Sequence, residues 1–229
     1  TLALRLAPGH TGHTLVVTDG VFSMAGDVAP LPELAAACRA RGAWLFVDDA
    51  HGLGVLGPTG RGSVEAAGLT VDDVPILMAT LGKAIGTFGA FVAGSSELVE
   101  VLMQKARTYI FSTAEPALIA HALLTAIDLI EQGDARRANL AARIAQLRAT
   151  LKPQRWQLLP SETAIQPLVI GGNAETMDVA ARLFERGLWV PGIRPPTVPA
   201  GSARLRITLS AAHTEAQVAR LVGALKELE

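Results

Sequence analysis

The chain has a single cysteine, Cys38, among its 229 residues, so no disulfide can form within it. Cys38 follows three alanines, and we expect it to be a small buried residue of the core. The formal net charge is only −1, which argues against a nucleic-acid-binding or anionic-membrane surface. No uninterrupted apolar run reaches the roughly 18 residues of a membrane-spanning helix.

Residues 1–13 lack a basic start followed by an apolar stretch and a cleavage site, so we do not expect a signal peptide. A soluble cytoplasmic protein is therefore the default expectation. Half of the residues are hydrophobic and 18% are charged, a balance that supports a packed core. The length is sufficient for one large domain or two smaller ones, and no internal repeat or low-complexity segment is present.

The first part of the chain alternates short apolar runs with helical patterns, which predicts an α/β unit with parallel strands. A helix is expected between Pro32 and Gly42, because proline near the start and glycine after the end are helix signals. The expected strands are 15–18, 44–47, 76–79 and 91–93, and the further helices are 97–107, 116–132 and 135–151.

A second alternation follows two prolines, Pro153 and Pro160, and predicts a smaller α+β unit. Its expected strands are 165–170, 188–190 and 204–209, and its expected helices are 176–186 and one from Thr214 onward. Thr214 and Gln217 have the spacing of a capping box. We place the boundary near residues 150–162, with 1–155 as part of a large domain and 156–229 as a small C-terminal domain.

Two acids and a histidine follow the strand 44–47 directly. Asp48, Asp49 and His51 should therefore lie at the carboxyl edge of the sheet, where open α/β folds bind ligands. A carboxylate beside a pyridinium nitrogen keeps that nitrogen protonated, which suits pyridoxal 5′-phosphate (PLP). Two alternatives are a helix N-cap and a metal-dependent hydrolase that uses these three residues. No second cluster of ligands near in sequence would complete a metal site.

Lys83 lies between two apolar runs and among glycines, and it offers a primary amine to the aldehyde of such a cofactor. The small residues around it would let a bulky ring approach the backbone. Thr80, three residues earlier, could give its hydroxyl to a phosphate. The segment 82–86 is not a Walker A loop, and the alternative for Lys83 is a lysine at a hairpin turn.

Arginines in the second part are candidates for binding a substrate carboxylate. Arg194 lies in a proline-stiffened loop, and Arg204 and Arg206 alternate with apolar residues, so both should point to one face of a strand. The alternative is a solvent-facing strand edge. Ser112 and Thr113 precede a helix, where they suit either an anion or an ordinary N-cap.

Four separated motifs together resemble the α-oxoamine synthases, which are PLP enzymes with the aspartate-aminotransferase fold. They are VTDGVFSM at 17–24, VDDAHG at 47–52, TLGK at 80–83 and RPPTVP at 194–199. The resemblance implies the fold type I PLP-transferase architecture. That fold has a large domain with a mostly parallel sheet and helices on both faces, and a smaller α+β C-terminal domain.

The resemblance also implies roles for individual residues. Lys83 would bond covalently to the cofactor and move protons at the substrate α-carbon, and Asp48 would pair with the pyridine nitrogen. Residues His51 and Ser23 would contact the ring-oxygen side. The phosphate would be bound by Thr80 and, from the partner subunit of a homodimer, by Ser112 or Thr113. For the substrate carboxylate Arg206 is the first choice and Arg194 the second, with Thr197 also at the substrate.

Within the family, the stretches 164–167 and 193–206 most resemble members that condense L-alanine with a pimeloyl thioester in biotin biosynthesis. The acyl carrier is either coenzyme A or acyl carrier protein. A glycine-using member and an inactive, merely dimerising fragment are the alternatives. Family members have a long segment before the 17–24 motif that contributes a phosphate-binding turn and a ring-stacking histidine. We expect the 229 residues to lack this N-terminal part and, alone, to be inactive and to bind PLP poorly.

Overall fold

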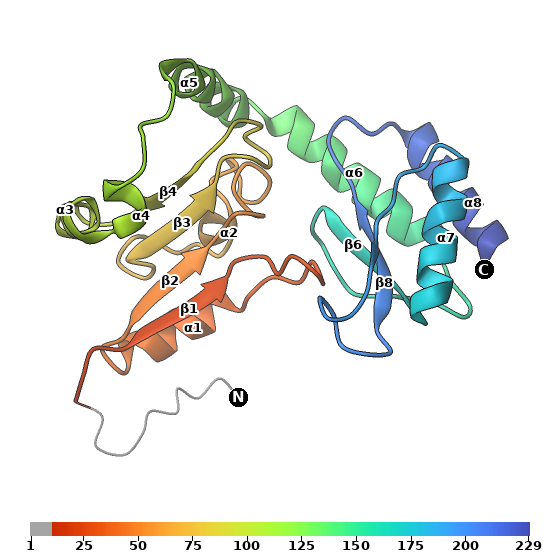
Figure 1. The fold of residues 1–229 in the computed structure, drawn as a ribbon, viewed down its shortest axis with the longest axis horizontal. Coiled ribbons are helices and arrows are strands. Elements are labelled where there is room, and N and C mark those ends of the chain that lie inside the picture. Colours follow the sequence, from red (N-terminus) through yellow and green to blue (C-terminus); the bar gives the residue numbers. More distant parts are fainter. Residues whose placement is uncertain (1–10) are drawn as a thin grey trace. The chain divides into compact units, whose positions relative to one another are not determined.

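The computed structural model describes residues 11–229, which form two compact units (Figure 1). In the described part, the first unit contains residues 11–21 and 29–134, and the second contains residues 22–28 and 135–229. The helix α6 (Asp134–Thr150) thus falls almost wholly in the second unit. The domain limits expected from the sequence, 1–155 and 156–229, stay a prediction.

The first unit is built on a four-stranded sheet in the order β1-β2-β3-β4 (Figure 1). Its three parallel strands are β1 (Leu15–Asp19), β2 (Trp44–Asp48) and β3 (Ile76–Thr80). The fourth strand, β4 (Ala90–Ala93), pairs with β3 in the antiparallel sense. The mostly parallel sheet expected from the sequence is therefore confirmed.

The core of this unit lies between the sheet and the helix α1 (Leu31–Arg39). Pro32 stands within the first turn of this helix, as the sequence predicted, and Pro30 is its N-cap residue. The apolar face of α1 packs against Leu45 and Val47 of β2, both 0% exposed. Cys38 belongs to this cluster at 2% exposure, so its expected role as a small core residue is confirmed.

The remaining helices of the first unit are shorter or more exposed. They are α2 (Ser63–Ala66), α3 (Ser96–Lys105), α4 (Arg107–Ile110) and α5 (Ala117–Glu131). The single helix expected at 97–107 is wrong in its end, because Ala106 adopts an extended conformation that separates α3 from α4. The helix α5 is rich in apolar side chains, yet none of its residues is buried.

The second unit has an antiparallel sheet in the order β5-β6-β8-β7. Its strands are β5 (Gln157–Leu158), β6 (Ile165–Gly171), β7 (Gly192–Ile193) and β8 (Ala203–Thr208). The helices α7 (Asn173–Glu185) and α8 (Glu215–Leu228) lie side by side against it (Figure 1).

The strand expected at 188–190 is wrong, and the observed strand β7 begins at Gly192. The backbone N–H of Leu188 donates to Leu183 O, so this residue closes the end of α7 instead of starting a strand. Gly187, at φ +72, takes the left-handed conformation that this ending requires.

The final helix, α8, begins with the capping box that the sequence predicted. The Thr214 side chain accepts a hydrogen bond from Gln217 N at 3.2 Å, and Gln217 Oε1 accepts one from Thr214 N at 2.8 Å. Its buried residues form an apolar stripe: Val218, Leu221, Val222, Ala224, Leu225 and Leu228. Among the described residues, no helix is both long and apolar enough to cross a bilayer.

Candidate active site

One face of the sheet in the first unit packs on α1, and α1 leaves the other face open. Asp48 lies on the open face, away from the core. Side chains alternate between the faces of a strand. Because Leu45 and Val47 are buried against α1, Asp48 lies on the open face, where it is half-buried. The strand thus delivers this carboxylate to the side of the sheet that α1 leaves uncovered.

The parallel register extends this open face across β1 and β3. Asp19 and Met78 are the neighbours of Asp48 on the two flanking strands. Leu77 packs on the α1 side, so Met78 and, two residues on, Thr80 lie on the same face as Asp48.

The amine of Lys83 belongs to this group of side chains. Its Nζ donates to Thr80 Oγ1 at 2.9 Å, while the side chain remains exposed. One face of the sheet therefore presents an amine, a hydroxyl and a carboxylate. The amine is hydrogen-bonded to the hydroxyl. Such a set suits a ligand with an aldehyde, anionic oxygens and a basic ring nitrogen.

Asp19 is a member of this face that the sequence reasoning missed. Burial and, to a lesser degree, the nearby Asp48 raise the pKa of Asp19. The signal was present in the sequence, because Asp19 follows its strand as Asp48 follows the next one. Only the register, however, shows that the two acids are neighbours.

The turn after β2 holds His51 close to Asp48 in sequence. The Asp48 Oδ1 accepts a hydrogen bond from Ala50 N at 3.0 Å, two residues on. This is a local turn contact, and residues 50–57 are turn and bend, so Asp48 does not cap a helix that starts there. His51 is half-buried within this turn.

Asp49 differs from Asp48 because it points into the interior at 1% exposure. Its Oδ2 accepts a hydrogen bond from Ser63 N at 2.7 Å, at the first residue of α2. Burial raises the pKa of Asp49 to about 6, against the opposing effects of the Ser63 hydroxyl and amide.

The different directions of Asp48 and Asp49 argue against the metal-dependent hydrolase that the sequence left as an alternative. Its proposed ligands included both acids, which face opposite ways from the sheet. Within residues 11–229, no three His, Cys, Asp or Glu side chains are grouped as a metal site would need.

Two arginines of β8 point to one face of their strand, as expected. Arg206 Nε donates to Ser23 O at 2.6 Å, and Arg204 Nη1 donates to Met24 O at 3.4 Å. Arg204 is 8% exposed and also bonds to Ser202 through its Nε and Nη2. Arg206 makes fewer hydrogen bonds than Arg204 within residues 11–229, where its other contact runs from Nη1 to Thr208 Oγ1 at 3.2 Å.

Burial lowers the pKa of Arg206, but a guanidinium remains charged at neutral pH. The guanidinium has five N–H donors, and its contacts to Ser23 and Thr208 use two of them. Among the described residues, an edge of the guanidinium with Nη1 and Nη2 is therefore left for a carboxylate.

The other predicted residues of the second unit lie on the surface. Arg194 and Thr197 are exposed, and Arg194 Nη1 contacts Met177 Sδ at 3.2 Å. In the first unit, Ser112 and Thr113 are also exposed, and the Ser112 hydroxyl donates to Thr108 O. Neither caps α5, whose N-cap is Pro116, so the N-cap alternative for Ser112 and Thr113 is wrong.

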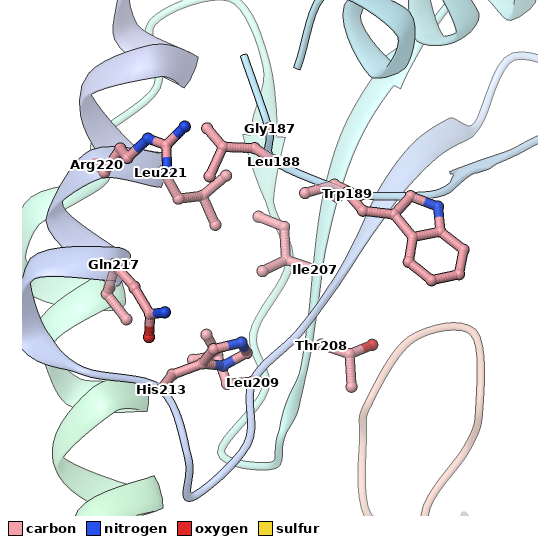
Figure 2. Close-up of a pocket in the computed structure, with 12 residues that line it drawn as sticks. Gly187, Leu188, Trp189, Ile207, Thr208, Leu209, His213, Gln217, Arg220 and Leu221 are labelled. Atoms are coloured by element: carbon pink, nitrogen blue, oxygen red, sulfur yellow. The ribbon is translucent and has the colours of Figure 1, made fainter. Parts of the chain in front are cut away.

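A pocket of about 350 Å³ opens in the second unit, and Figure 2 shows the residues that line it. Its wall is apolar at Ile207, Leu209 and Leu221, with His213 and Arg220 among its polar residues. None of the residues that the sequence predicted for the site lines it.

Comparison with known proteins places these observations in a family context. The family model for aminotransferase class I and II matches residues 3–225. An 8-amino-7-oxononanoate synthase of Janthinobacterium sp. (strain Marseille) is 56% identical over 230 residues, covering 100% of this chain and 58% of that protein. One of Thioalkalivibrio sulfidiphilus (strain HL-EbGR7) is 59% identical over 225 residues, covering 98% and 57%. The chain thus spans somewhat more than half the length of these relatives.

Solved structures share the fold. Serine palmitoyltransferase of Sphingomonas wittichii matches with a TM-score of 0.89 and 34% identity, over 95% of this chain and 55% of that one. The 8-amino-7-oxononanoate synthase of Francisella tularensis matches with a TM-score of 0.83 and 30% identity, over 96% and 63%. A structure of SPT with PLP matches with a TM-score of 0.87 and 32% identity, over 93% and 54%. The expected fold type I architecture is confirmed.

Proposed function

Because the chain belongs to the class I and II aminotransferase family, we propose that it is part of a PLP-dependent acyltransferase. The proposed reaction joins L-alanine to a pimeloyl thioester of coenzyme A or acyl carrier protein. It yields 8-amino-7-oxononanoate, CO2 and the free carrier, in biotin biosynthesis. The observation that carries the proposal is the shared sheet face of Asp48, Thr80 and the Lys83 amine, in a chain whose curated relatives have this name.

The residues of the first unit fit PLP. Lys83 presents an exposed amine for covalent attachment to the aldehyde, and Thr80 next to it presents a hydroxyl for the phosphate. The Asp48 carboxylate would hold the ring nitrogen in its protonated form. When bound, PLP supplies a ring that withdraws electrons from the substrate α-carbon. We assign the ring-oxygen side to His51 and Ser23.

The substrate contacts are proposed for the second unit. Arg206 has an unused guanidinium edge that matches the fork of an amino-acid carboxylate, whereas Arg204 is buried and committed to backbone and Ser202. Arg194 stays the second choice, and Thr197, in the same loop, is proposed to contact substrate. In this role Arg206 orients L-alanine, and the Lys83 amine moves the proton at its α-carbon.

Covalent trapping tests the cofactor site directly. Borohydride reduction of the full-length protein with PLP should fix a phosphopyridoxyl group on the peptide that contains Lys83, as read by mass spectrometry. Lys83→Ala should abolish both the label and turnover. The exposed Lys226→Ala, in the last turn of α8, is the control and should change neither. A label on any other lysine would overturn the assignment.

Substrate preference separates the proposal from its alternatives. Release of the thiol carrier from pimeloyl thioesters should be faster with L-alanine than with glycine. A preference for glycine would assign the chain to a glycine-using α-oxoamine synthase. Absence of turnover with either amino acid, together with retained folding, would favour a non-catalytic dimerising unit.

A further inference from the structure

Asp49 is a buried acid that the proposed reaction does not use. At 1% exposure it is among the most buried charged groups of the described chain. Its backbone N–H donates to Met78 O of β3 at 2.7 Å, and its carbonyl accepts from Gly52 N at 3.1 Å and Leu53 N at 3.0 Å. Its carboxylate reaches across to Ser63 N at 2.7 Å. One residue therefore connects the sheet, the following turn and the start of α2.

Three buried glycines, Gly20, Gly52 and Gly62, lie close to this carboxylate. A Cβ on Gly52 or Gly62 would clash with a carboxylate oxygen of Asp49, and a Cβ on Gly20 would lie 2.6 Å from Asp49 Oδ1. Gly20 and Gly52 have no left-handed backbone conformation that would itself demand glycine. Glycine at position 52 is explained by the space that the Asp49 carboxylate occupies, and glycine at position 20 by the space that this carboxylate and the Ser63 hydroxyl occupy together.

The contact closes the base of the loop formed by residues 50–62. Further along this loop, Gly54 N donates to Gly60 O at 2.7 Å, and Gly62 N donates to Leu56 O at 2.9 Å. Glu65 Oε2 accepts from Thr59 N and Arg61 N at 3.1 and 3.0 Å. The loop is thus tied at its base by Asp49 and near its tip by Glu65, and His51 lies in its first turn.

We propose that Asp49 is a positioning residue, whose buried carboxylate holds the 50–62 loop on Ser63 and thereby orients Asp48 and His51. This inference rests on the proposed function, since those two residues are the ones assigned to the cofactor ring. Asp48 and His51 flank Asp49 closely in sequence, so a shift of its backbone moves both. Asp49 acts through its neighbours and is assigned no contact with substrate.

The second oxygen of the Asp49 carboxylate carries a cost of burial. Its Oδ1 and the Ser63 hydroxyl are both buried and, among the described residues, make no hydrogen bond of normal geometry. Burial raises the pKa of Asp49 to about 6, because an enclosed carboxylate is costly to ionise.

A set of variants in the full-length protein tests the proposal. Asp49→Asn keeps an oxygen that can accept from Ser63 N, whereas Asp49→Ala removes it. We expect PLP affinity to fall on the order of tenfold in Asp49→Ala and less in Asp49→Asn. Hydrogen exchange of the 50–62 loop in the cofactor-free protein should quicken in the same order. The exposed Asp72→Asn is the matched control and should leave both measurements unchanged.

A double-mutant cycle keeps the test informative if one variant folds poorly. Gly52→Ala alone should loosen the loop, because the new methyl group clashes with Asp49. In the Asp49→Ala background the same substitution should cost nothing further. Additive effects of the two substitutions on hydrogen exchange would overturn the steric link between them.

The failures of this inference and of the proposed function are distinguishable. Wild-type PLP affinity and loop exchange in Asp49→Ala, with Lys83 still labelled by borohydride, would overturn the positioning role alone. Absence of Lys83 labelling in the wild-type protein would overturn the cofactor assignment. In that case, faster exchange of the 50–62 loop in Asp49→Ala would show that Asp49 anchors the loop. It would also contradict a role of Asp49 in positioning residues for PLP.

Discussion

At the scale of single residues, two adjacent aspartates have different environments and therefore different chemistry. Asp48 is half-buried on the open face of the sheet, whereas Asp49 is buried in the interior next to three glycines. A half-exposed carboxylate can meet a cationic ring, whereas an enclosed one can only hold the protein itself together. Neighbouring residues at a strand end differ in this way because successive side chains point to opposite faces of the sheet.

The raised pKa of Asp49 predicts a specific pH dependence of stability. With a pKa of about 6 in the folded protein against 3.8 as its ordinary value, the folded state binds the proton more tightly than the unfolded state. The contribution of this group to the free energy of unfolding therefore falls as pH rises from about 4 to about 6, by about 3 kcal/mol.

Urea unfolding of wild type and Asp49→Asn across this pH range measures that difference. Between pH about 4 and about 6, wild type should lose more stability than Asp49→Asn, because the asparagine has no proton to exchange. Equal slopes in the two proteins would contradict a raised pKa at this site.

At the scale of secondary-structure elements, hydrogen bonds at helix ends add to the stability of the second unit. The capping box of α8 satisfies two backbone N–H groups that would otherwise lack partners in the helix. We expect Thr214→Ala to lower the free energy of unfolding by about 1 kcal/mol. Thr11→Ala, at an exposed threonine outside any helix, is the control. Equal stability of the two variants in urea would show that the cap contributes nothing.

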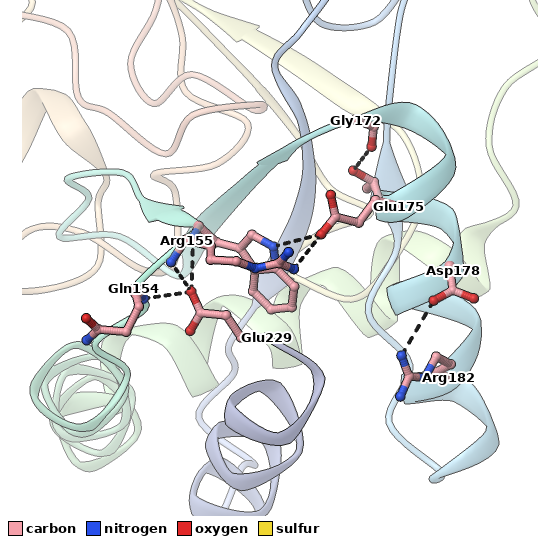
Figure 3. A network of polar contacts seen from close by, with 9 residues as sticks. Gln154, Arg155, Gly172, Glu175, Asp178, Arg182 and Glu229 are labelled. Carbon is pink, nitrogen blue, oxygen red and sulfur yellow. Dashed lines mark hydrogen bonds and ion pairs between the residues drawn. The ribbon is translucent and has the colours of Figure 1, made fainter.

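The other end of α8 is tied by Glu229 to the segment that follows α6 (Figure 3). Glu229 Oε1 accepts from the backbone N–H groups of Gln154, at 2.6 Å, of Arg155, and of Trp156, at 3.0 Å. Partial burial raises the pKa of Glu229, but these three donors outweigh it, so the net pKa lies below the ordinary value.

A lowered pKa makes this tie sensitive to acid. Its stabilising contribution is present above the ordinary pKa of 4.5 and is lost as pH falls through the lower folded value. Glu229→Gln should therefore unfold at a lower urea concentration than wild type at pH 7, and the difference should shrink in acid. A difference that persists unchanged in acid would refute the charge-based explanation.

At the scale of the whole molecule, α5 has an apolar surface that nothing in the described chain buries. Leu118 is 75% exposed and Leu124 is 65% exposed, in a helix with no buried residue. Apolar surface of this kind is typical of a protein–protein interface. We predict that the full-length protein forms a homodimer and that α5 contributes to its contact, near the segment with Ser112 and Thr113.

Leu124→Asp should weaken the dimer at least about tenfold, because a charge would be buried at the contact. Sedimentation of the full-length protein measures the change. Phe184→Asp, at a residue of α7 that is 67% exposed, is the matched control and should leave the dimer intact. Unchanged association of Leu124→Asp would place the interface elsewhere.

Much of this architecture could be predicted from the residues alone, because the signals are local. The strand periodicity of 15–18 and 44–47, the proline in the first turn of α1 and the Thr214–Gln217 spacing depend on neighbours in the chain. The strand expected at 188–190 failed because the turn that closes α7 competes for the same residues.

The chain's order of residues by itself determined that two acids follow a buried strand and that a lysine follows the next one. Only the tertiary structure decided which acid shares a face with that lysine, because the answer depends on α1 covering one side of the sheet and on the parallel register. It likewise decided that Asp19 is the neighbour of Asp48 and that Gly20, Gly52 and Gly62 enclose Asp49. These contacts join segments distant in sequence, and packing, rather than any local pattern, brings them together.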